Sequence, residues 1–223
     1  MSQLEHAAEG FVSVAHMAEA LRVPGAALPG SPFKAGSGAR SDRDLVPHVD
    51  ARELDVTAAR LARDISSSAR RVIGLLPAGP TSDALSLAEP LGRGVVMLDG
   101  RFSVVLDPER RSVPADAPSG GVAIARALTA GVVLIAPNET MRPGAKAEGI
   151  KQLLGVVRQR EDTWRAVFVD LSGCALPGEL LDVLPLFDGI VIVGRSGKAT
   201  ETELRRSSAR VPSELNMGVV LLD

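Results

Sequence analysis

The chain has 223 residues, of which 45% are apolar and 23% charged, and its formal net charge is −2. This length suffices for one sizeable α/β domain plus an additional segment, and the near-neutral balance gives no overall field that would attract nucleic acid. The single cysteine, Cys174, excludes a disulfide framework and a cysteine-rich metal site. The three histidines precede residue 50, so we expect no histidine-based catalytic centre. We find no bilayer-spanning apolar run and no signal peptide, and expect a cytoplasmic protein.

The first fifty residues differ in composition from the rest. Apolar residues recur at helical spacing from Gln3 to Arg22, which predicts an amphipathic helix. This helix packs on its own domain or docks on a partner, and its few basic residues weigh against a membrane surface. Residues 24–49 are rich in Pro, Gly, Ser and charge, which is typical of a flexible linker. We therefore expect residues 1–50 to be a helix and linker and residues 51–223 to be one domain.

The domain is predicted to begin with a helix and a buried strand. Residues 54–66 have apolar side chains at helical spacing, with Arg60 and Arg63 off the apolar face. An exposed, solvated arginine pair is the simplest reading of these two residues. Residues 72–76 form a short apolar run of the kind that fills a buried parallel strand.

A breaker-rich loop, PAGPTSD, follows this strand and leads into a helix predicted at residues 84–91. We expect a second buried strand at Val95–Leu98, with Asp99 at its carboxyl end. Ligands of open α/β sheets bind at the carboxyl ends of strands, beside helix N-termini, so the loop stands where a phosphate-binding loop would be. Its sequence lacks the glycines and the lysine of the pattern GxxxxGK[ST].

The remaining elements are predicted from the same periodicities, with a surface loop at residues 107–121. Buried strands are expected at residues 132–136, 164–170, 189–193 and 217–222. Helices are expected at residues 122–129, 147–157 and 176–186, and after Thr200, where Glu203 completes a capping box. The alternation predicts an α/β fold with three layers: a mostly parallel, doubly wound sheet with helices on both faces. The strand at residues 72–76 should be central, with those at 95–98 and 167–170 nearby, and antiparallel neighbours around it would contradict this fold.

The stretch from Arg71 to Ser103 resembles the nucleotide-binding segment of bacterial tyrosine kinases of the polysaccharide co-polymerase type. These kinases are a branch of the ParA/MinD-like P-loop ATPases, and their loop reads roughly T-S-A-x-P-G-E-G-K-S-T. In a comparison without gaps, the two glycines, the lysine, the serine and the threonine are replaced or matched in turn by Thr81, Asp83, Ala84, Leu85 and Ser86. An aspartate repels a phosphate, and an alanine supplies no compensating charge.

Two acidic motifs of the kinases also have counterparts. The segment VVMLDGRFS resembles h-h-h-h-D-x-D-x-R, with Asp99 at the first aspartate. Arg101 then replaces the second aspartate, which in the family helps to hold magnesium. Asp170 matches the Walker B-like aspartate, although the residues after it differ from the family's Asp-Thr-Pro-Pro.

The helix before the first strand carries a Glu-x-x-Arg-x-x-Arg motif in these kinases, where it joins neighbouring subunits in a ring. Thr57 stands here in the place of the glutamate, and Arg60 and Arg63 match the two arginines. The motif therefore indicates a possible contact with a partner or a second copy, but without its acidic residue.

The resemblance implies a P-loop NTPase-like fold, and the replaced residues predict a catalytically inactive protein with no catalytic residues, metal or cofactor. We expect an interaction or regulatory subunit in exopolysaccharide or capsule biosynthesis and export. Its partner would be an inner-membrane polysaccharide co-polymerase or a related kinase, which would place it at the inner membrane; a homo-oligomer is also possible, and nucleic acid is not expected. The kinases phosphorylate a tyrosine cluster, and these 223 residues contain no tyrosine. The alternatives are an active ATPase or tyrosine autokinase with an atypical loop, a MinD/ParA-like positioning ATPase, or a fold with a purely structural role.

Overall fold

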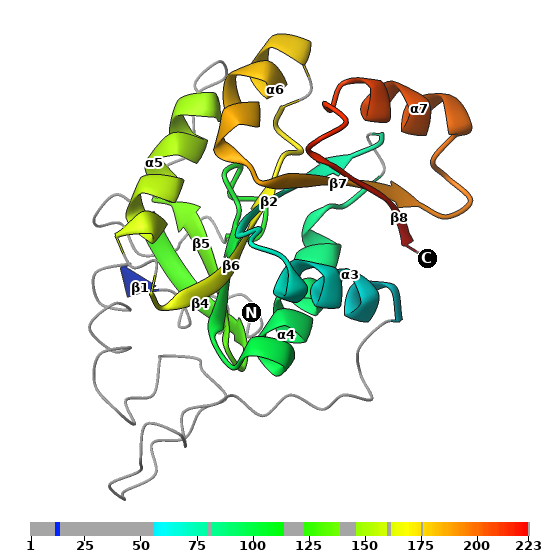
Figure 1. Ribbon diagram of the computed structural model, residues 1–223. Helices are drawn as coiled ribbons and strands as arrows, with labels where there is room; N and C mark the ends of the chain where they lie inside the picture. Colours follow the sequence, from blue (N-terminus) through cyan, green and yellow to red (C-terminus); the bar gives the residue numbers. More distant parts are fainter. Residues whose placement is uncertain are drawn as a thin grey trace, which may run out of the picture.

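A computed structural model describes residues 12–13, 56–79, 82–113, 123–138, 146–159, 162–174 and 176–222. They form an eight-stranded sheet in the order β1-β4-β5-β3-β6-β2-β7-β8 (Figure 1). The strands are β1 (Val12–Ser13), β2 (Val72–Pro77), β3 (Phe102–Leu106), β4 (Ala123–Thr129), β5 (Val132–Pro137), β6 (Trp164–Asp170), β7 (Gly189–Arg195) and β8 (Asn216–Leu222). The helices are α3 (Val56–Ser67), α4 (Leu85–Asp99), α5 (Lys146–Arg158), α6 (Pro177–Val183) and α7 (Glu201–Ala209), with a 3-10 turn, η3 (Leu184–Leu186), after α6.

The centre of the sheet is parallel. Strand β2 lies between β6 and β7 and is parallel to both. Strand β3 is parallel to β5 and β6, and β8 is parallel to β7. The antiparallel pairs are β4 with β5 and β1 with β4, at one end of the sheet. The predicted fold class and the central place of β2 are confirmed.

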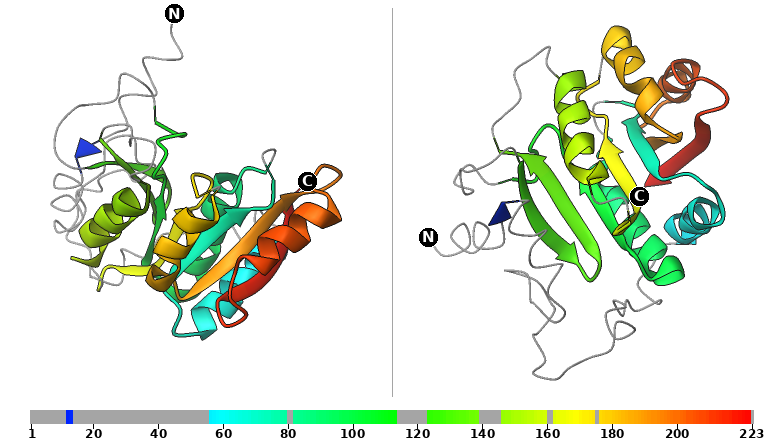
Figure 2. Two further views of the ribbon diagram at one scale, coloured as in Figure 1. Left: turned by 90° about the horizontal axis from the view of Figure 1, so that it is seen from above. Right: turned by 60° about the vertical axis from the view of Figure 1, so that its left-hand side comes forward.

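Helices cover both faces of the sheet, as Figure 2 shows from two further directions. Helices α3 and α4 pack on one face, in a core that includes Ile65 and Phe168. Helices α5 and α6 pack on the other face, with Leu106 and Ile150 in their core. The central strands need apolar side chains on both faces, which explains why β2 and β6 read as continuous apolar runs. The three-layer arrangement is therefore a direct consequence of the alternating strand and helix patterns.

Helix α7 begins with the predicted capping box. The Thr200 side chain accepts a hydrogen bond from the backbone N–H of Glu203 at 3.2 Å, and the Glu203 carboxylate accepts one from the Thr200 N–H at 2.8 Å. The Glu203 carboxylate accepts hydrogen bonds from the backbone N–H and the hydroxyl of Thr200, and these two bonds lower the pKa of Glu203. The capping prediction is confirmed, and α7 packs beside β7 and β8.

The strand predicted at Val95–Leu98 is wrong. These residues continue α4, whose buried residues keep helical spacing through Leu91, Val95 and Val96. The helix ends at Gly100, whose φ of 71° lies in the left-handed region and whose N–H bonds to the Val96 carbonyl at 2.8 Å. A short apolar run is compatible with a strand and with a buried helix, and here the helix continued. The actual strand, β3, follows the glycine.

The helix predicted at residues 122–129 is also wrong. Residues 123–129 form β4, which pairs with β5 through a tight connection at Gly131, where φ is 79°. Pairing with an adjacent buried strand outweighed the alanine-rich local composition, because strand preference depends on burial and neighbours. The loop predicted at 107–121 is buried rather than exposed at its start, at Asp107 and Pro108, and residues 114–121 lie outside the described residues.

Two residues of the predicted N-terminal helix are described. Val12 and Ser13 form β1 and pair with Ala125 and Ile124 of β4, so the helical prediction is wrong at these two positions. The rest of that helix and the linker lie outside the described residues, and the division into residues 1–50 and 51–223 remains a prediction.

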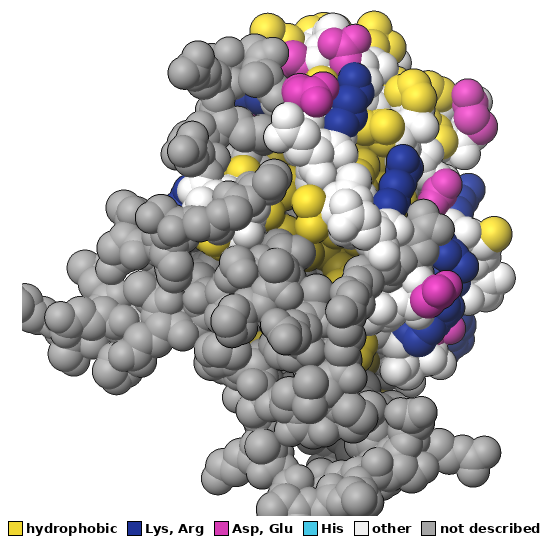
Figure 3. All heavy atoms as spheres, turned by 90° about the vertical axis from the view of Figure 1, so that its left-hand side faces the viewer, with side chains coloured by type: hydrophobic (Ala, Val, Ile, Leu, Met, Phe, Trp, Pro, Cys, Tyr) yellow, Lys and Arg dark blue, Asp and Glu magenta, His cyan; other side chains and the backbone are white. Residues whose placement is uncertain are grey.

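The surface carries charges of both signs. In Figure 3, dark blue and magenta side chains alternate over the described part of that face, without a large area of one sign. Among the described residues, no helix is both long and apolar enough to cross a bilayer.

Candidate functional site: a cleft at the carboxyl ends of the parallel strands

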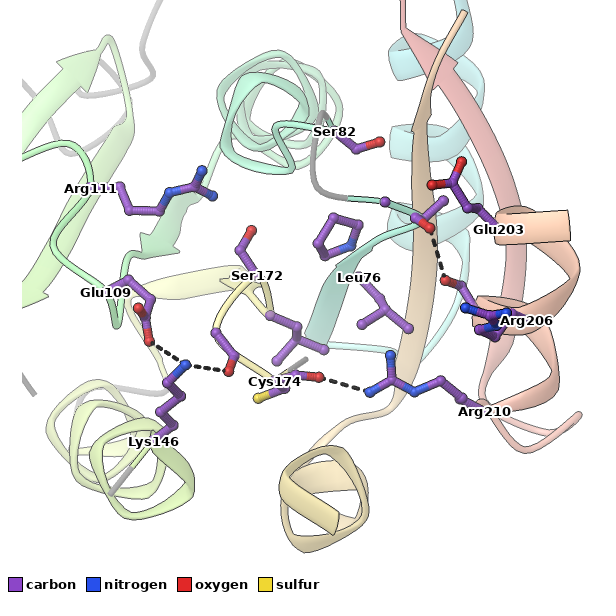
Figure 4. Close-up of a pocket in the computed structure, with 16 residues that line it drawn as sticks. Leu76, Ser82, Glu109, Arg111, Lys146, Ser172, Cys174, Glu203, Arg206 and Arg210 are labelled. Carbon is purple, nitrogen blue, oxygen red and sulfur yellow. Dashed lines mark hydrogen bonds and ion pairs between the residues drawn. The ribbon is translucent and has the colours of Figure 1, made fainter. Parts of the chain in front are cut away.

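A cleft of about 520 Å³ opens at the carboxyl ends of β2 and β6 (Figure 4). Its walls come from five segments: the loop after β2, the loop after β3, the loop after β6, the first residue of α5, and α7. Carboxyl ends of neighbouring parallel strands meet at one edge of a sheet, which is where open α/β sheets bind ligands. The cleft therefore has the position that the sequence predicted for a phosphate site.

The N-terminus of α4 faces this region, and it is met by a carboxylate of the chain itself. The Asp83 Oδ1 atom accepts a hydrogen bond from the Leu85 N–H at 3.2 Å, and the Ser86 hydroxyl donates to the Asp83 carbonyl at 2.6 Å. Ala84 is fully buried, and Thr81 lies outside the described residues. Free N–H groups at a helix N-terminus normally favour a bound anion. Here the side chain of Asp83 takes that role and adds a negative charge.

Helix α4 begins at Leu85, so the loop can also be aligned with GxxxxGK[ST] by placing the lysine position at the first residue of the helix. The segment GPTSDALS, residues 79–86, has the length of that pattern, with Gly79 at the first glycine and Ser86 at the hydroxyl position. Leu85 then stands at the lysine position, instead of Ala84 in the comparison without gaps. Either comparison puts an apolar side chain where the lysine should be.

Helix α7 approaches this loop closely. A Cβ added to Gly79 would lie 2.9 Å from the Glu203 Oε1 atom, so glycine leaves room for that carboxylate. Ser207 donates from its hydroxyl to the Ala78 carbonyl at 3.4 Å. The loop after β2 is therefore packed against α7, with a carboxylate beside it.

Two buried carboxylates lie at the carboxyl ends of the neighbouring strands β3 and β6. Asp107 is 0% exposed and Asp170 is 1% exposed. The Asp107 Oδ2 atom accepts from the Ser112 N–H at 2.7 Å, and the Asp170 Oδ1 atom accepts from the Ser172 N–H at 2.9 Å and from its hydroxyl at 2.5 Å. The second oxygen of each carboxylate has no hydrogen bond within the described part of the chain. The Asp170 Oδ2 atom lies 3.9 Å from the guanidinium of Arg111.

The pKa of Asp170 lies above the ordinary aspartate value. Burial is the main cause, and the nearby carboxylate of Asp107 adds to it. The hydrogen bonds from Ser172 and the charge of Arg111 act in the opposite direction and are weaker together. Asp170, which the sequence singled out, is thus a buried carboxylate whose charged form is disfavoured at this edge of the sheet.

The structure does not place Asp99 and Arg101 in the cleft. Asp99 ends α4, which runs from the carboxyl end of β2 to the amino end of β3, so it lies at the opposite edge of the sheet. There its carboxylate binds the Arg165 guanidinium at 3.0 Å. Arg101 is exposed in the turn before β3. The prediction that these two residues belong to a nucleotide site is wrong, because the segment is a helix end and not a strand end.

The acidic pattern occurs one strand later. Residues 104–111 read VVLDPERR, which places Asp107, Glu109 and Arg111 in the order D-x-acid-x-R directly after β3. Glu109 and Arg111 line the cleft, and Asp107 forms the buried pair with Asp170. The sequence points to Asp99 instead, because the segment VVMLD is more apolar than VVLD and resembles a buried strand more closely. The pattern itself, with glutamate in place of the second aspartate, was the signal that could have found them.

Basic side chains also reach the cleft. Lys146 donates to the Gly173 carbonyl at 2.7 Å and lies 3.5 Å from the Glu109 carboxylate, and Arg210 donates to the Cys174 carbonyl at 2.8 Å. These two cations hold the loop after β6. Burial raises the pKa of the Cys174 thiol to about 12, so the thiol is not a nucleophile at neutral pH.

The exposed face of α3 carries the residues that resemble an oligomerisation motif. Thr57, Arg60 and Arg63 are exposed, and Ala58, Leu61 and Ile65 form the buried stripe. The structure therefore leaves both arginines available to a partner, as the helical spacing predicted.

We expect Asp170→Asn to raise the free energy of unfolding at neutral pH by about 1 kcal/mol, because burial disfavours the charged form of Asp170 and asparagine carries no charge. The pKa of Asp170 is raised in the folded protein, so the folded state binds the proton more tightly than the unfolded chain does. The stabilisation that protonated Asp170 gives the folded state is complete below the pKa that this group has in the unfolded chain. It is lost as the pH rises through the pKa that the group has in the folded protein. The stabilisation by asparagine should therefore shrink on acidification, and urea denaturation at several pH values measures it. Glu148→Gln, a first-turn residue of α5, serves as a surface control, and equal pH profiles for wild type and Asp170→Asn would contradict the prediction.

Known structures share this fold. The BceF tyrosine kinase domain matches with a TM-score of 0.53 and 19% identity over 74% of this chain and 73% of that domain. The kinase domain of the Escherichia coli tyrosine kinase ETK matches with a TM-score of 0.56 and 16% identity over 73% and 71% of the two chains. The VpsO kinase domain matches with a TM-score of 0.52 and 13% identity over 75% and 96%. The sequence matches no protein-family description and no curated protein. At these identities the comparison establishes the fold alone: a mostly parallel α/β sheet with helices on both faces, arranged as in bacterial tyrosine kinase domains.

Proposed function

We propose that this chain is a catalytically inactive counterpart of bacterial tyrosine kinase domains that acts as an interaction or regulatory subunit in exopolysaccharide or capsule production. The observation that carries the proposal is the N-terminus of α4. Its lysine position is apolar, and the Asp83 carboxylate occupies the first amide of the helix. The surrounding α/β core nevertheless contains two extensive clusters of buried apolar residues, one on each face of the sheet.

The energetic argument rests on the number of phosphate contacts that are missing. Each hydrogen bond to a charged phosphate contributes about 1.5–3 kcal/mol in such a site. Losing the lysine and one glycine, and adding the negative charge of Asp83, removes several such contacts together. The chain keeps an apolar α/β core but lacks the residues that bind phosphate, which supports a role in binding other proteins through its surface.

A second candidate is an ATPase or kinase with an atypical loop, and one observation favours it. Asp107 and Asp170 keep free carboxylate oxygens in a buried position at the strand ends, and oxygen ligands of this kind suit a hard divalent cation such as magnesium. Arg111, 3.9 Å from Asp170, already supplies a positive charge there. The described residues contain no group of three histidine, cysteine or acidic side chains that could hold a metal. Titration with ATP and magnesium separates the two candidates.

The partner we propose is the cytoplasmic segment of an inner-membrane polysaccharide co-polymerase or a related kinase, and this contact would bring the chain to the membrane. Arg60 and Arg63 are exposed on α3, and Thr57 stands where an acidic residue would complete a self-contact. A partner that supplies the missing carboxylate is complementary to this face, whereas a ring of identical chains through it lacks that charge.

The test is a pull-down of the co-polymerase segment by the wild type and by Arg60→Glu/Arg63→Glu. We expect the charge reversal to reduce recovery by tenfold or more, because like charges at such a contact cost on the order of 1–2 kcal/mol. Arg205→Glu is the matched control, since Arg205 is exposed on α7, in another region of the surface. Equal recovery by wild type and the α3 variant would show that α3 is not the docking face.

A further inference from the structure

Strand β8 forms one end of the sheet in the described part of the chain, and it is an unusually apolar edge. It pairs with β7 on one side only, and Figure 1 shows it at the outer end of the sheet beside α7. Its sequence, NMGVVLL, contains no charge and no proline. Natural edge strands are normally protected by lysine, proline or inward-pointing charges, because their free N–H and C=O groups can pair with another strand. This edge carries none of these side-chain protections.

The apolar side chains of the edge are divided between two faces. Val220 is buried in the core under α3, whereas Val219 is 46% exposed and Leu221 is 52% exposed. Residues at positions i and i+2 of a strand share a face, so Val219 and Leu221 stand together on the opposite side. Leu221 leans over Gly194 of β7, where an added Cβ would lie 2.8 Å from its Cδ2 atom. The two side chains thus form a short apolar strip next to the free edge.

A bulge fixes which residues can pair. The pairing of β7 with β8 shifts between Ile190 and Ile192, and Gly218 has a φ of 105° with its N–H bonded to the Asn216 side chain at 2.9 Å. The regular part of the edge is therefore the four-residue run Val219–Leu222.

We propose that β8 is a homodimer interface, in which the β8 edges of two copies pair antiparallel about Val220. This register places Val219 of each copy directly opposite Leu221 of the other, so the two apolar strips join into one strip of four side chains. Directly opposed apolar pairs stabilise antiparallel strands. In this arrangement the side chain of Val220 stays buried in the core of its own copy, on the other face of the sheet from the strip.

The sequence of β8 favours a second copy of this chain as the binding partner. A two-fold contact requires the same surface on both sides, and the pairing about Val220 is self-complementary because both members of each opposed pair are apolar. The net charge of −2 is small, so repulsion between copies is weak. This contact is independent of the proposed function, because its side-chain contacts come from Val219 and Leu221, on the face of β8 opposite to the Val220 side chain, and not from Arg60 and Arg63 of α3.

The experiment measures the molar mass of the full chain by light scattering and sedimentation over a concentration series. Wild type should shift from monomer to dimer with concentration. Val219→Lys/Leu221→Lys places like charges opposite each other, and it should raise the dimer dissociation constant by at least about tenfold, or 1.4 kcal/mol. Val219→Glu/Leu221→Lys places opposite charges across the same pairs and should dimerise more tightly than the double lysine variant.

Leu181→Lys is the matched control, because Leu181 is an apolar residue of α6 that is 61% exposed. It should dimerise like the wild type. Thermal unfolding of each variant establishes that the substitution has not unfolded the chain. If a variant does unfold, cysteine trapping replaces it: a mixture of Val219→Cys and Leu221→Cys should form an intermolecular disulfide, since directly opposed residues have the Cα separation that a disulfide requires. Native Cys174 is buried and gives no background.

Each outcome of these measurements either supports or overturns the β8 dimer. A dimer that the lysine pair weakens, the charge-paired variant restores and Leu181→Lys leaves unchanged establishes the interface. A wild type that is monomeric at every concentration overturns the proposal. So does a dimer that is indifferent to the lysine pair, or one weakened equally by both charged variants, or cysteine trapping no faster than with Leu181→Cys. None of these results affects the pull-down through α3.

Discussion

Arg165→Leu is expected to lower the free energy of unfolding by about 3–5 kcal/mol, because it removes the buried partner of an ion pair together with its charged hydrogen bonds to main-chain carbonyls. Arg165 is 5% exposed, at the amino end of β6, and its Nε atom lies 3.0 Å from the Asp99 carboxylate. Its other nitrogens donate to the carbonyls of Ile65, Ser66, Ser68 and Arg70 at 2.8–3.0 Å. One side chain therefore satisfies the carboxyl end of α3, the end of α4 and the approach to β2. Leucine would leave the partly exposed Asp99 carboxylate and several carbonyl groups without partners.

Urea denaturation of the wild type and Arg165→Leu measures this effect. Arg205→Ala is the matched control, because Arg205 also binds a carboxylate, that of Glu201, but both side chains are more than three-quarters exposed. An exposed pair of this type contributes about 0.5 kcal/mol or less. Similar losses for the two substitutions would show that burial of Arg165 is not what matters.

ATP and ADP, with or without magnesium, are expected to bind with dissociation constants no lower than about 1 mM, or −4.1 kcal/mol. The reasons are the apolar lysine position at Ala84 or Leu85 and the Asp83 carboxylate at the helix N-terminus. Asp83→Gly/Leu85→Lys removes that carboxylate and supplies the cation on the half-buried first residue of α4. Each restored contact should tighten phosphate binding by about tenfold, since charge-assisted hydrogen bonds contribute about 1.5–3 kcal/mol.

Isothermal titration calorimetry is the measurement, with Asp83→Gly/Leu85→Met as the control that opens the loop without adding charge. The control should bind ATP as weakly as the wild type. A micromolar dissociation constant for the wild type would favour the ATPase over the inactive interaction subunit. Transfer of phosphate to a tyrosine of a partner would identify the chain as a kinase. Failure of the lysine variant to gain affinity would show that the acidic residues Glu109 and Glu203, which also line the cleft, exclude the phosphates by themselves.

The fold could be predicted where one periodicity was unambiguous. Strands β2, β5, β6, β7 and β8 are short apolar runs bounded by breakers, and α3 and α5 have clear helical stripes. The capping box of α7 predicted its start because it is a local arrangement of Thr200 and Glu203. Elements whose identity depends on distant pairing were not predictable in this way. The run at 95–98 fits a helix and a strand equally, and only packing of α4 on the sheet decides between them.

The wrong strand at 95–98 also affected the predicted site residues. Misplacing one strand moved the acidic motif from Asp107 to Asp99, which lies at the opposite edge of the sheet. Asp170 was predicted correctly as the residue after which β6 ends, because its strand was correct. Lys146 and Arg210 reach the cleft from α5 and from the end of α7, and no local pattern could indicate this, since side chains from segments far apart in the sequence meet only in the folded chain.

The central position of β2 has a consequence for the order in which the chain can fold during synthesis. Its two neighbours, β6 and β7, are encoded near the other end of the chain, and the Val72 N–H bonds to Asp188, 116 residues later. A ribosome releases β2, α4 and β3 long before either neighbour exists, so the strand at the middle of the mature sheet has both edges open while residues 78–163 are made. The β4–β5 hairpin, by contrast, can close as soon as it emerges. Strand β2 is therefore enclosed on both sides only when residues 189–195 have left the ribosome, and the edge strand β8 is added after that. Until then the growing chain depends on protection of that apolar strand.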